Sequence, residues 1–140
     1  MVIMLLNAAC NVFLQNSVRN YVVQYLLELK VASGTDDVLD QLEGNFGYLS
    51  VQKYSSNVVE KCLECAREPR RIRIISELIN SPLLLQILQD PYGNYVIQSA
   101  IKLCKGSLHA AFMKIIRPHI PVLRSNPYGR KVLSSFSTKK

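Results

Sequence analysis

The chain has 140 residues, of which 49% are hydrophobic, and it contains only six glycines and six prolines. This length fits one packed domain, and this composition excludes a disordered tail and a collagen-like or low-complexity segment. The formal charge is +7, and the basic excess lies in residues 61–140, which hold 14 basic and 4 acidic side chains. A segregated basic surface favours either a polyanionic partner such as nucleic acid or solubility alone.

The opening apolar run at residues 2–6 is too short for a membrane span, which needs about 18 apolar residues. No basic flank precedes it, so we expect no secretory leader, no membrane association and a cytoplasmic, or alternatively nuclear, location. Cys62 and Cys65 have the spacing of a metal or redox pair, but His109 and His119 stand ten residues apart. Because no second pair completes a zinc site, the cysteines are predicted to be core residues, and no metal or other cofactor is expected.

A pentapeptide pattern recurs along the chain at steps of 36 and 38 residues. It reads Asn-Tyr-Val-Val-Gln at 20–24, Ser-Asn-Val-Val-Glu at 56–60 and Asn-Tyr-Val-Ile-Gln at 94–98. A weaker fourth copy, Arg-Lys-Val-Leu-Ser, follows at 130–134. An apolar residue stands seven positions ahead of all four copies. A long, fixed period with matching apolar positions indicates stacked helical repeats, because no single unit can cover its own hydrophobic face.

In chain order, the pattern divides the single domain 1–140 into repeat units and a cap. The units span 1–42, 43–80 and 81–117, and a closing cap spans 118–140. Each unit is predicted to form a helix over its pentapeptide, because the apolar residues there recur at helical spacing. A second helix is predicted after it, beginning near Gly34 in the first unit, covering 70–79 in the second and capped by Ser107 in the third. Shorter helices are predicted ahead of the pentapeptides, for example over 81–88.

Three residues of each pentapeptide have the chemistry to recognise a nucleotide base. We name the first, second and fifth residues the first slot, the stacking slot and the fifth slot. On a helix the first and fifth slots are neighbours, and all three are expected to face outward while the apolar residues turn into the core. Asparagine and glutamine amides donate and accept hydrogen bonds, which suits the Watson–Crick edge of uracil, and tyrosine offers a ring for stacking.

The second copy differs in a way that changes the preferred base. Glu60 fills its fifth slot, and Ser56 fills its first slot. A carboxylate only accepts hydrogen bonds, so it suits guanine, whose N1–H and N2 amino group are adjacent donors. For any one copy taken alone, a solvated helix face is the favoured explanation. Three copies in register, with one chemically consistent substitution, favour base recognition.

At these residues the sequence resembles the Pumilio family of RNA-binding proteins, also called PUF proteins, over nearly the whole chain. Residues 89–98 resemble a uracil-reading repeat, residues 56–62 resemble the guanine-reading repeat, and residues 116–130 resemble the segment that closes the array. The resemblance implies an all-α fold, a right-handed α-solenoid (an α-α superhelix of armadillo-like Pumilio repeats). It also implies a truncated array of about three repeats plus a C-terminal cap, equivalent to the sixth to eighth of the usual eight repeats.

The resemblance further implies how RNA would lie on the chain. The family reads one base per repeat, with the RNA antiparallel to the protein, so the three units are implied to read the core 5′-UGU-3′ from the third unit to the first. The residues implied to bind RNA are Asn20, Tyr21, Gln24, Ser56, Asn57, Glu60, Asn94, Tyr95 and Gln98. The fourth copy is predicted to cap the array and to touch phosphate.

Basic side chains near the slots are candidates for attraction of the RNA backbone. They are Arg19, Lys53, Lys61, Lys102, Arg130 and Lys131. For the three lysines within the units, a solvated helix surface is an equal alternative. A separate run on the opposite side of the second unit is predicted to be solvated rather than to contact RNA, and it comprises Arg67, Arg70, Arg71 and Arg73.

The expected function is sequence-specific binding of single-stranded RNA in post-transcriptional or translational regulation of mRNA, through elements of the 3′ untranslated region. Two alternatives stay open. The first is a protein-interaction module that docks a partner on an N-terminal face carrying Ile3, Leu5 and Leu6. The second is a degenerate, truncated Pumilio relative with little RNA affinity. Catalysis is not expected, because the chain has two histidines, no glycine-rich phosphate loop and no nucleophile signature.

Overall fold

The structure, a computed structural model, describes residues 17–29 and 32–138, with the side chains of 21–29 and 34–136. Every regular element in these ranges is helical, which confirms the predicted all-α solenoid. The helices are α2 (Ser17–Glu28), α3 (Ala32–Leu42), α4 (Phe46–Ser50), α5 (Ser55–Cys65), α6 (Glu68–Ile79), α7 (Leu84–Leu88), α8 (Gly93–Leu103), α9 (Gly106–Ile116), the 3₁₀ turn η1 (Arg117–His119), α10 (Ile120–Arg124) and α11 (Pro127–Thr138).

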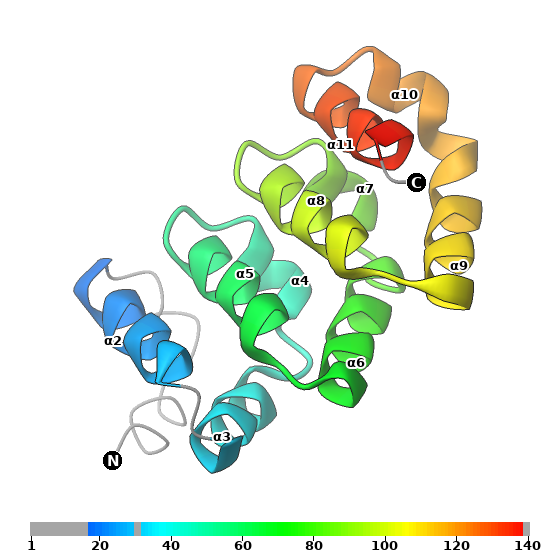
Figure 1. The fold of residues 1–140 in the computed structure, drawn as a ribbon. Helices are drawn as coiled ribbons and strands as arrows, with labels where there is room; N and C mark the ends of the chain where they lie inside the picture. Colours follow the sequence, from blue (N-terminus) through cyan, green and yellow to red (C-terminus); the bar gives the residue numbers. More distant parts are fainter. Residues whose placement is uncertain (1–16, 30–31, 139–140) are drawn as a thin grey trace.

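The helices form two rows that run along the array (Figure 1). The first row consists of α2, α5, α8 and α11, and each helix packs side by side against the next. The second row consists of α3, α6 and α9, while the short helices α4, α7 and α10 pack against α5, α8 and α11. All four pentapeptides lie in the first row, so the repeated sequence occupies one face of the solenoid.

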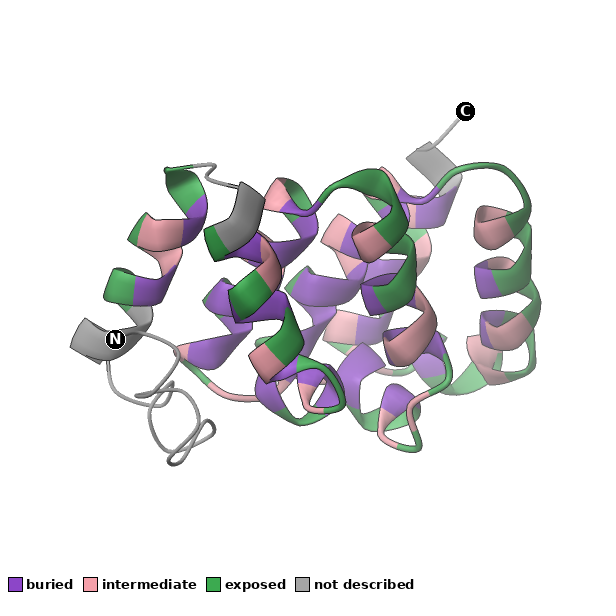
Figure 2. Ribbon diagram, turned by 90° about the horizontal axis from the view of Figure 1, so that it is seen from below, coloured by how far each residue is buried: buried purple, intermediate pink, exposed green. Residues whose placement is uncertain are grey.

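The core runs between the two rows, and its residues are the apolar positions of the repeat (Figure 2). Both apolar residues of the second and third pentapeptides are fully buried, as are Leu49, Ile87 and Leu123, seven positions ahead of the slots. In the first pentapeptide Val23 is buried but Val22 is 47% exposed, contrary to the prediction, because α2 is the terminal first-row helix among the described residues and has one first-row neighbour, α5.

The helix starts are fixed by side chains that accept backbone hydrogen bonds. Asp90 Oδ2 accepts the N–H groups two and three residues further on, both at 2.8 Å, and Asn126 Oδ1 does the same at 2.9 Å. These hydrogen bonds cap the amino-terminal ends of α8 and α11. The start of α4 is capped from the second row instead, where Glu77 accepts the N–H groups of Gly44 and Phe46 at 2.8 and 2.9 Å. Such contacts satisfy donors that have no partner within the helix.

The short helices approach the first row closely enough to restrict the residue type there. A Cβ atom on Gly93 would lie 2.7 Å from the carbonyl oxygen of Ile87, and one on Gly129 would meet a main-chain oxygen at 2.5 Å. The equivalent position in the second unit is Ser55, whose hydroxyl donates to the carbonyl of Leu49 at 2.8 Å. In all three places the first-row helix therefore approaches the main chain of the short helix closely, at a glycine in two units and through the Ser55 hydroxyl in the third.

The arginines of the second-row run have partners within the protein, although Arg67 and Arg73 stay more than half exposed, as the predicted solvated face requires. Three of them, one at the N-cap of α6 and two within it, bridge to α3 and the residue that follows it. The pairs are Arg67–Asp36 (2.6 Å), Arg70–Asp40 (2.6 Å) and Arg73–Glu43. The spacing of these residues brings each to the same side of α6, facing the acidic side of α3. The basic run therefore joins neighbouring units.

The remaining arginine of the run, Arg71, caps the carboxyl end of α5. Its guanidinium donates hydrogen bonds to the carbonyl oxygens of Leu63 at 2.7 Å, Glu64 at 3.2 Å and Ala66 at 3.0 Å. The last carbonyls of a helix lack partners within it, and they form its negative end, so a planar cation with several donors suits them.

Two local predictions need correction. The short helix predicted over 81–88 begins only at Leu84, because Ser81 and its neighbours form a turn in which the Ser81 hydroxyl accepts the N–H of Leu83 at 3.1 Å. Ser107 is not an N-cap, since α9 already begins at Gly106.

Cys62 and Cys104 are buried as predicted. Among the described residues, no helix is long and apolar enough to cross a membrane, and no cluster of side chains could hold a metal ion.

The contacts of α6 lead to a prediction about stability. Arg71→Ala should lower the free energy of unfolding by about 1–3 kcal/mol, because three carbonyls lose their partners. Arg67→Ala should lower it by less than about 1 kcal/mol, because the Arg67 side chain is 68% exposed and its ion pair is screened. Urea denaturation of the two variants checks this order, and equal losses would contradict the capping role of Arg71.

Candidate nucleic-acid interface

The stacking slots project from the first row into solvent. Tyr21 is 67% exposed and Tyr95 is 46% exposed, and Asn57 is also exposed. In the fourth copy this slot holds Lys131, which is exposed as well. The four side chains belong to successive helices of one row, so they form a line of exposed groups along the array, as the sequence predicted.

The first slots of the second and third units are not exposed, contrary to the prediction that all three slots face outward. Asn94 is fully buried and Ser56 is 3% exposed. Asn94 Nδ2 donates to the carbonyls of Asp90 and Pro91 at 2.7 and 3.1 Å, and Ser56 donates to the carbonyl of Lys53 at 3.3 Å. The turn ahead of each helix supplies carbonyls at these positions, and they draw the short polar side chain inward. Arg19 and Asn20 lie in α2, but their side chains are outside the described residues.

The fifth slots are half-buried at the edge of the same face. Gln98 Nε2 donates to Asn94 Oδ1 at 3.0 Å, so the first and fifth slots of the third unit meet as helical spacing predicts. Asn94 is thereby held by three hydrogen bonds, and Gln98 is the member of the pair that reaches the surface. Gln24 and Glu60 occupy the matching places in α2 and α5.

Two serines that the sequence analysis did not single out contact the fifth slots from the next unit. Ser99 Oγ donates to Glu60 Oε1 at 3.1 Å, and Ser135 Oγ lies 3.3 Å from Gln98 Oε1. Both serines directly follow a fifth slot in their own unit. Aligning the repeats places them at one position, but only the packing of adjacent helices shows that this position touches the previous unit.

Burial governs the electrostatics of Glu60. Desolvation raises the pKa of the Glu60 carboxyl above its ordinary value of 4.5, and the hydrogen bond from Ser99 opposes this. Smaller effects come from Glu64, which raises the pKa, and Lys61, which lowers it. A half-buried carboxylate at a slot of the exposed face, with acceptor sites beyond the one that Ser99 uses, can receive donors from a ligand.

The lysines of the second unit already have partners. Lys61 contacts Glu28 of α2 at 3.2 Å and Glu64 at 3.5 Å, and the hydrogen bond to Glu28 raises the pKa of Lys61. Lys53 lies 5.3 Å from the ring centroid of Tyr54. The charge of Lys61 is thus largely balanced by two carboxylates, whereas the partner given for Lys53 is an aromatic ring.

Two basic residues near the start of α11, Arg130 and Lys131, lie beside the third unit. Lys131 Nζ donates to the hydroxyl of Tyr95 at 3.1 Å and lies 5.3 Å from the centroid of that ring. Arg130 donates to the carbonyl of Arg124 and remains exposed. Lys102 is exposed near the end of α8. Lys131 therefore places positive charge directly at a stacking-slot ring.

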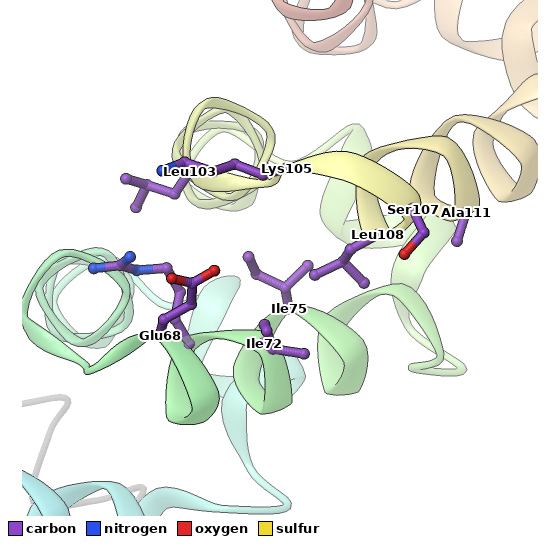
Figure 3. Close-up of a pocket in the computed structure, with 9 residues that line it drawn as sticks. Glu68, Ile72, Ile75, Leu103, Lys105, Ser107, Leu108 and Ala111 are labelled. Carbon is purple, nitrogen blue, oxygen red and sulfur yellow. The ribbon is translucent and has the colours of Figure 1, made fainter.

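A pocket between α6 and α9 lies in the second row, away from the slots (Figure 3). Ile72 and Ile75 of α6 line it opposite Leu108 of α9. Its lining includes no slot residue. The chemistry of the slots is thus presented on the first-row face and not inside this pocket.

A family model of the Pumilio-family RNA binding repeat matches the chain twice, at residues 45–79 and 84–115. The first match spans α4 to α6, and the second spans α7 to α9. Each includes one short helix, one first-row helix with its three slots, and one second-row helix. The match therefore covers the elements that form and support the slots of the second and third units.

The alignments with curated relatives cover most of this chain but only a small part of each relative. Pumilio homolog 12 of Arabidopsis thaliana is 55% identical over 126 residues, which cover 90% of this chain and 21% of that protein. A Pumilio domain-containing protein of Schizosaccharomyces pombe is 36% identical over 125 residues, covering 89% of this chain and 18% of that protein. The chain spans about a fifth of the length of these relatives.

Solved structures match the fold of the array. PUF-8 in complex with PBE-RNA matches with a TM-score of 0.79 at 30% identity, covering 89% of this chain and 38% of that one. The Puf3 RNA binding domain bound to a Cox17 RNA 3′ UTR recognition sequence also gives 0.79, at 31% identity, covering 88% of this chain and 34% of that one. The repeats, the relatives and the fold agree, and the chain belongs to the Pumilio family of proteins with RNA-binding repeats.

Proposed function

We propose that the first-row face binds single-stranded RNA with the core 5′-UGU-3′ and so takes part in post-transcriptional regulation of cytoplasmic mRNA through 3′ untranslated regions. The observation that supports this most strongly is the half-buried carboxylate of Glu60, set between two units whose fifth slots are glutamines. A carboxylate at this place suits a base with two adjacent donors, which guanine has and uracil lacks. The glutamines on either side suit uracil.

The spacing of the first row fits one base per unit. Packed helices lie about 8–10 Å apart, which leaves room for one flat base between the stacking-slot side chains of neighbouring helices. Tyr21 and Tyr95 supply aromatic faces, and Asn57 stands between them. Lys131, in α11 at one end of this line, and Lys53, in the turn ahead of α5, supply positive charge that would attract the RNA backbone. Base identity is then decided by the fifth slots, with Asn94 holding Gln98 in place.

The solved neighbour Puf3 is bound to a 3′ UTR recognition sequence, and this supports the proposed class of target. The buried cores and helix caps of the second and third units argue against a degenerate relative that has lost its packing. The N-terminal face invoked for a protein partner, with Ile3, Leu5 and Leu6, lies outside the described residues. Each stacked base contributes about 1–3 kcal/mol, so three units should bind more weakly than a longer array.

The proposal is tested by the middle base. The wild-type chain should bind RNA containing 5′-UGU-3′ more tightly than the same RNA with adenine, cytosine or uracil in the middle. Glu60→Gln should reduce the preference for guanine roughly tenfold, because the amide no longer offers two acceptors to two donors. Fluorescence anisotropy at fixed salt measures all eight affinities. Equal affinity of the wild-type chain for the four RNAs would refute the proposed core.

Glu60→Gln, which should weaken guanine recognition, should not weaken the folded state. The pKa of Glu60 is higher in the folded chain than in the unfolded chain, so the folded chain binds the carboxyl proton more tightly. The contribution of this group to stability therefore falls as the pH rises from the unfolded pKa through the folded pKa. At pH 7, Glu60→Gln should therefore be at least as stable as the wild-type chain, and its advantage should shrink as the pH approaches 4.5. Thermal melts at the two pH values measure this, and a variant that is less stable at pH 7 would contradict the cost of burying the carboxylate.

Stacking should matter regardless of sequence. Tyr95→Ala should weaken RNA binding by about 1–3 kcal/mol whichever base stacks on the ring, because every base has a face on which a ring can stack. Tyr48→Ala is a matched control, since Tyr48 is 41% exposed but lies on α4, outside the slots. Anisotropy titrations compare the two variants. An unchanged dissociation constant in Tyr95→Ala would show that this ring is only part of the surface.

A further inference from the structure

One contact across the first row joins a fifth slot to the next unit. Ser99 of α8 donates its hydroxyl hydrogen to Glu60 Oε1 of α5 at 3.1 Å. The two residues are 39 positions apart, so the contact exists only because α5 and α8 pack side by side. Ser99 is half-buried, in the same zone between core and surface as Glu60 itself. The hydrogen bond thus lies at the boundary between core and surface.

We propose that Ser99 is a positioning residue for guanine recognition, holding the Glu60 carboxylate so that its remaining acceptor sites face the middle base. This inference rests on the proposed function of Glu60. A carboxylate can accept about four hydrogen bonds, and it can rotate about its last torsion with little resistance. One donor fixed from the protein side restricts that rotation and leaves the other acceptor sites available to the two guanine donors.

The hydrogen bond from Ser99 also favours the ionised form of Glu60, which is the form that guanine requires. Burial raises the pKa of this carboxyl and Ser99 opposes that rise. Lys61 and Glu64 on α5 shift the pKa in opposite directions. Of the helices packed against α5, α2 carries Glu28, which pairs with Lys61, and α8 carries Lys102. Loss of the Ser99 hydroxyl would therefore extend the protonated form to higher pH. A protonated carboxyl presents an O–H donor where guanine needs an acceptor.

Ser135 provides an internal comparison one unit further along the chain. Its hydroxyl lies 3.3 Å from Gln98 Oε1 and 3.2 Å from the carbonyl of Lys131 in its own helix. One hydroxyl hydrogen is shared between these two acceptors, and Gln98 already has a partner in Asn94. Ser135 should therefore position Gln98 less strongly than Ser99 positions Glu60, and its influence should fall on the first base of the core rather than on the middle one.

The test compares three variants of the whole chain, Ser99→Ala, Ser99→Thr and Ser135→Ala, each with RNA cores UGU, UAU and CGU. Ser99→Ala should reduce the preference for UGU over UAU by roughly three- to tenfold and leave the preference over CGU unchanged. Ser99→Thr, which keeps a hydroxyl, should retain the wild-type preference. Ser135→Ala should leave the middle-base preference unchanged. The loss of guanine preference on acidification should begin at higher pH in Ser99→Ala than in the wild-type chain.

The outcomes separate this inference from the proposed function. If the wild-type chain prefers UGU but Ser99→Ala has the same base preferences and pH profile, the positioning role is wrong and the proposed function stands. If Ser99→Ala and Ser99→Thr lose the preference equally, the effect comes from packing and not from the hydroxyl, which also overturns the inference. If the wild-type chain has no preference, the proposed function itself fails. Circular dichroism confirms that each variant is folded.

Discussion

The burial of both apolar residues in the second and third pentapeptides fixes the rotation of α5 and α8, and the exposure of the slots depends on that rotation. Val58 and Val59 in α5, and their equivalents in α8, are fully buried against both neighbouring helices. With these residues inside, the residue before them must point to solvent, and the residue after them must lie at the boundary. The exposure of Asn57 and Tyr95 and the partial burial of Glu60 and Gln98 follow from this packing.

The second row holds the first row in register. Arg71 caps the end of α5, Glu77 caps the start of α4, and the ion pairs between α6 and α3 connect one unit to the next. These contacts involve none of the slot residues. The protein thus separates two tasks, because basic and acidic residues of the second row stabilise the array, while the polar residues of the first row remain available for a ligand.

The periodic part of this arrangement could be predicted from the sequence, because a fixed period reports which residues share a position. Helices over the pentapeptides, buried residues at Leu49 and Ile87, and exposed stacking slots all follow from that period. Contacts between units could not be predicted in the same way. The burial of Asn94 depends on carbonyls in a turn, the role of Arg71 depends on where α5 ends, and the contact of Ser99 joins residues 39 positions apart.

The central claim is that the three slots of a first-row helix determine which base is recognised. The most direct measurement gives the second unit the slots of the third, through Ser56→Asn, Asn57→Tyr and Glu60→Gln together, and determines the affinity of this variant for RNAs with UGU and UUU cores. The account predicts that the variant prefers UUU, because all three fifth slots then hold glutamine. A variant that still prefers UGU, or that binds both RNAs equally while folded, would contradict it.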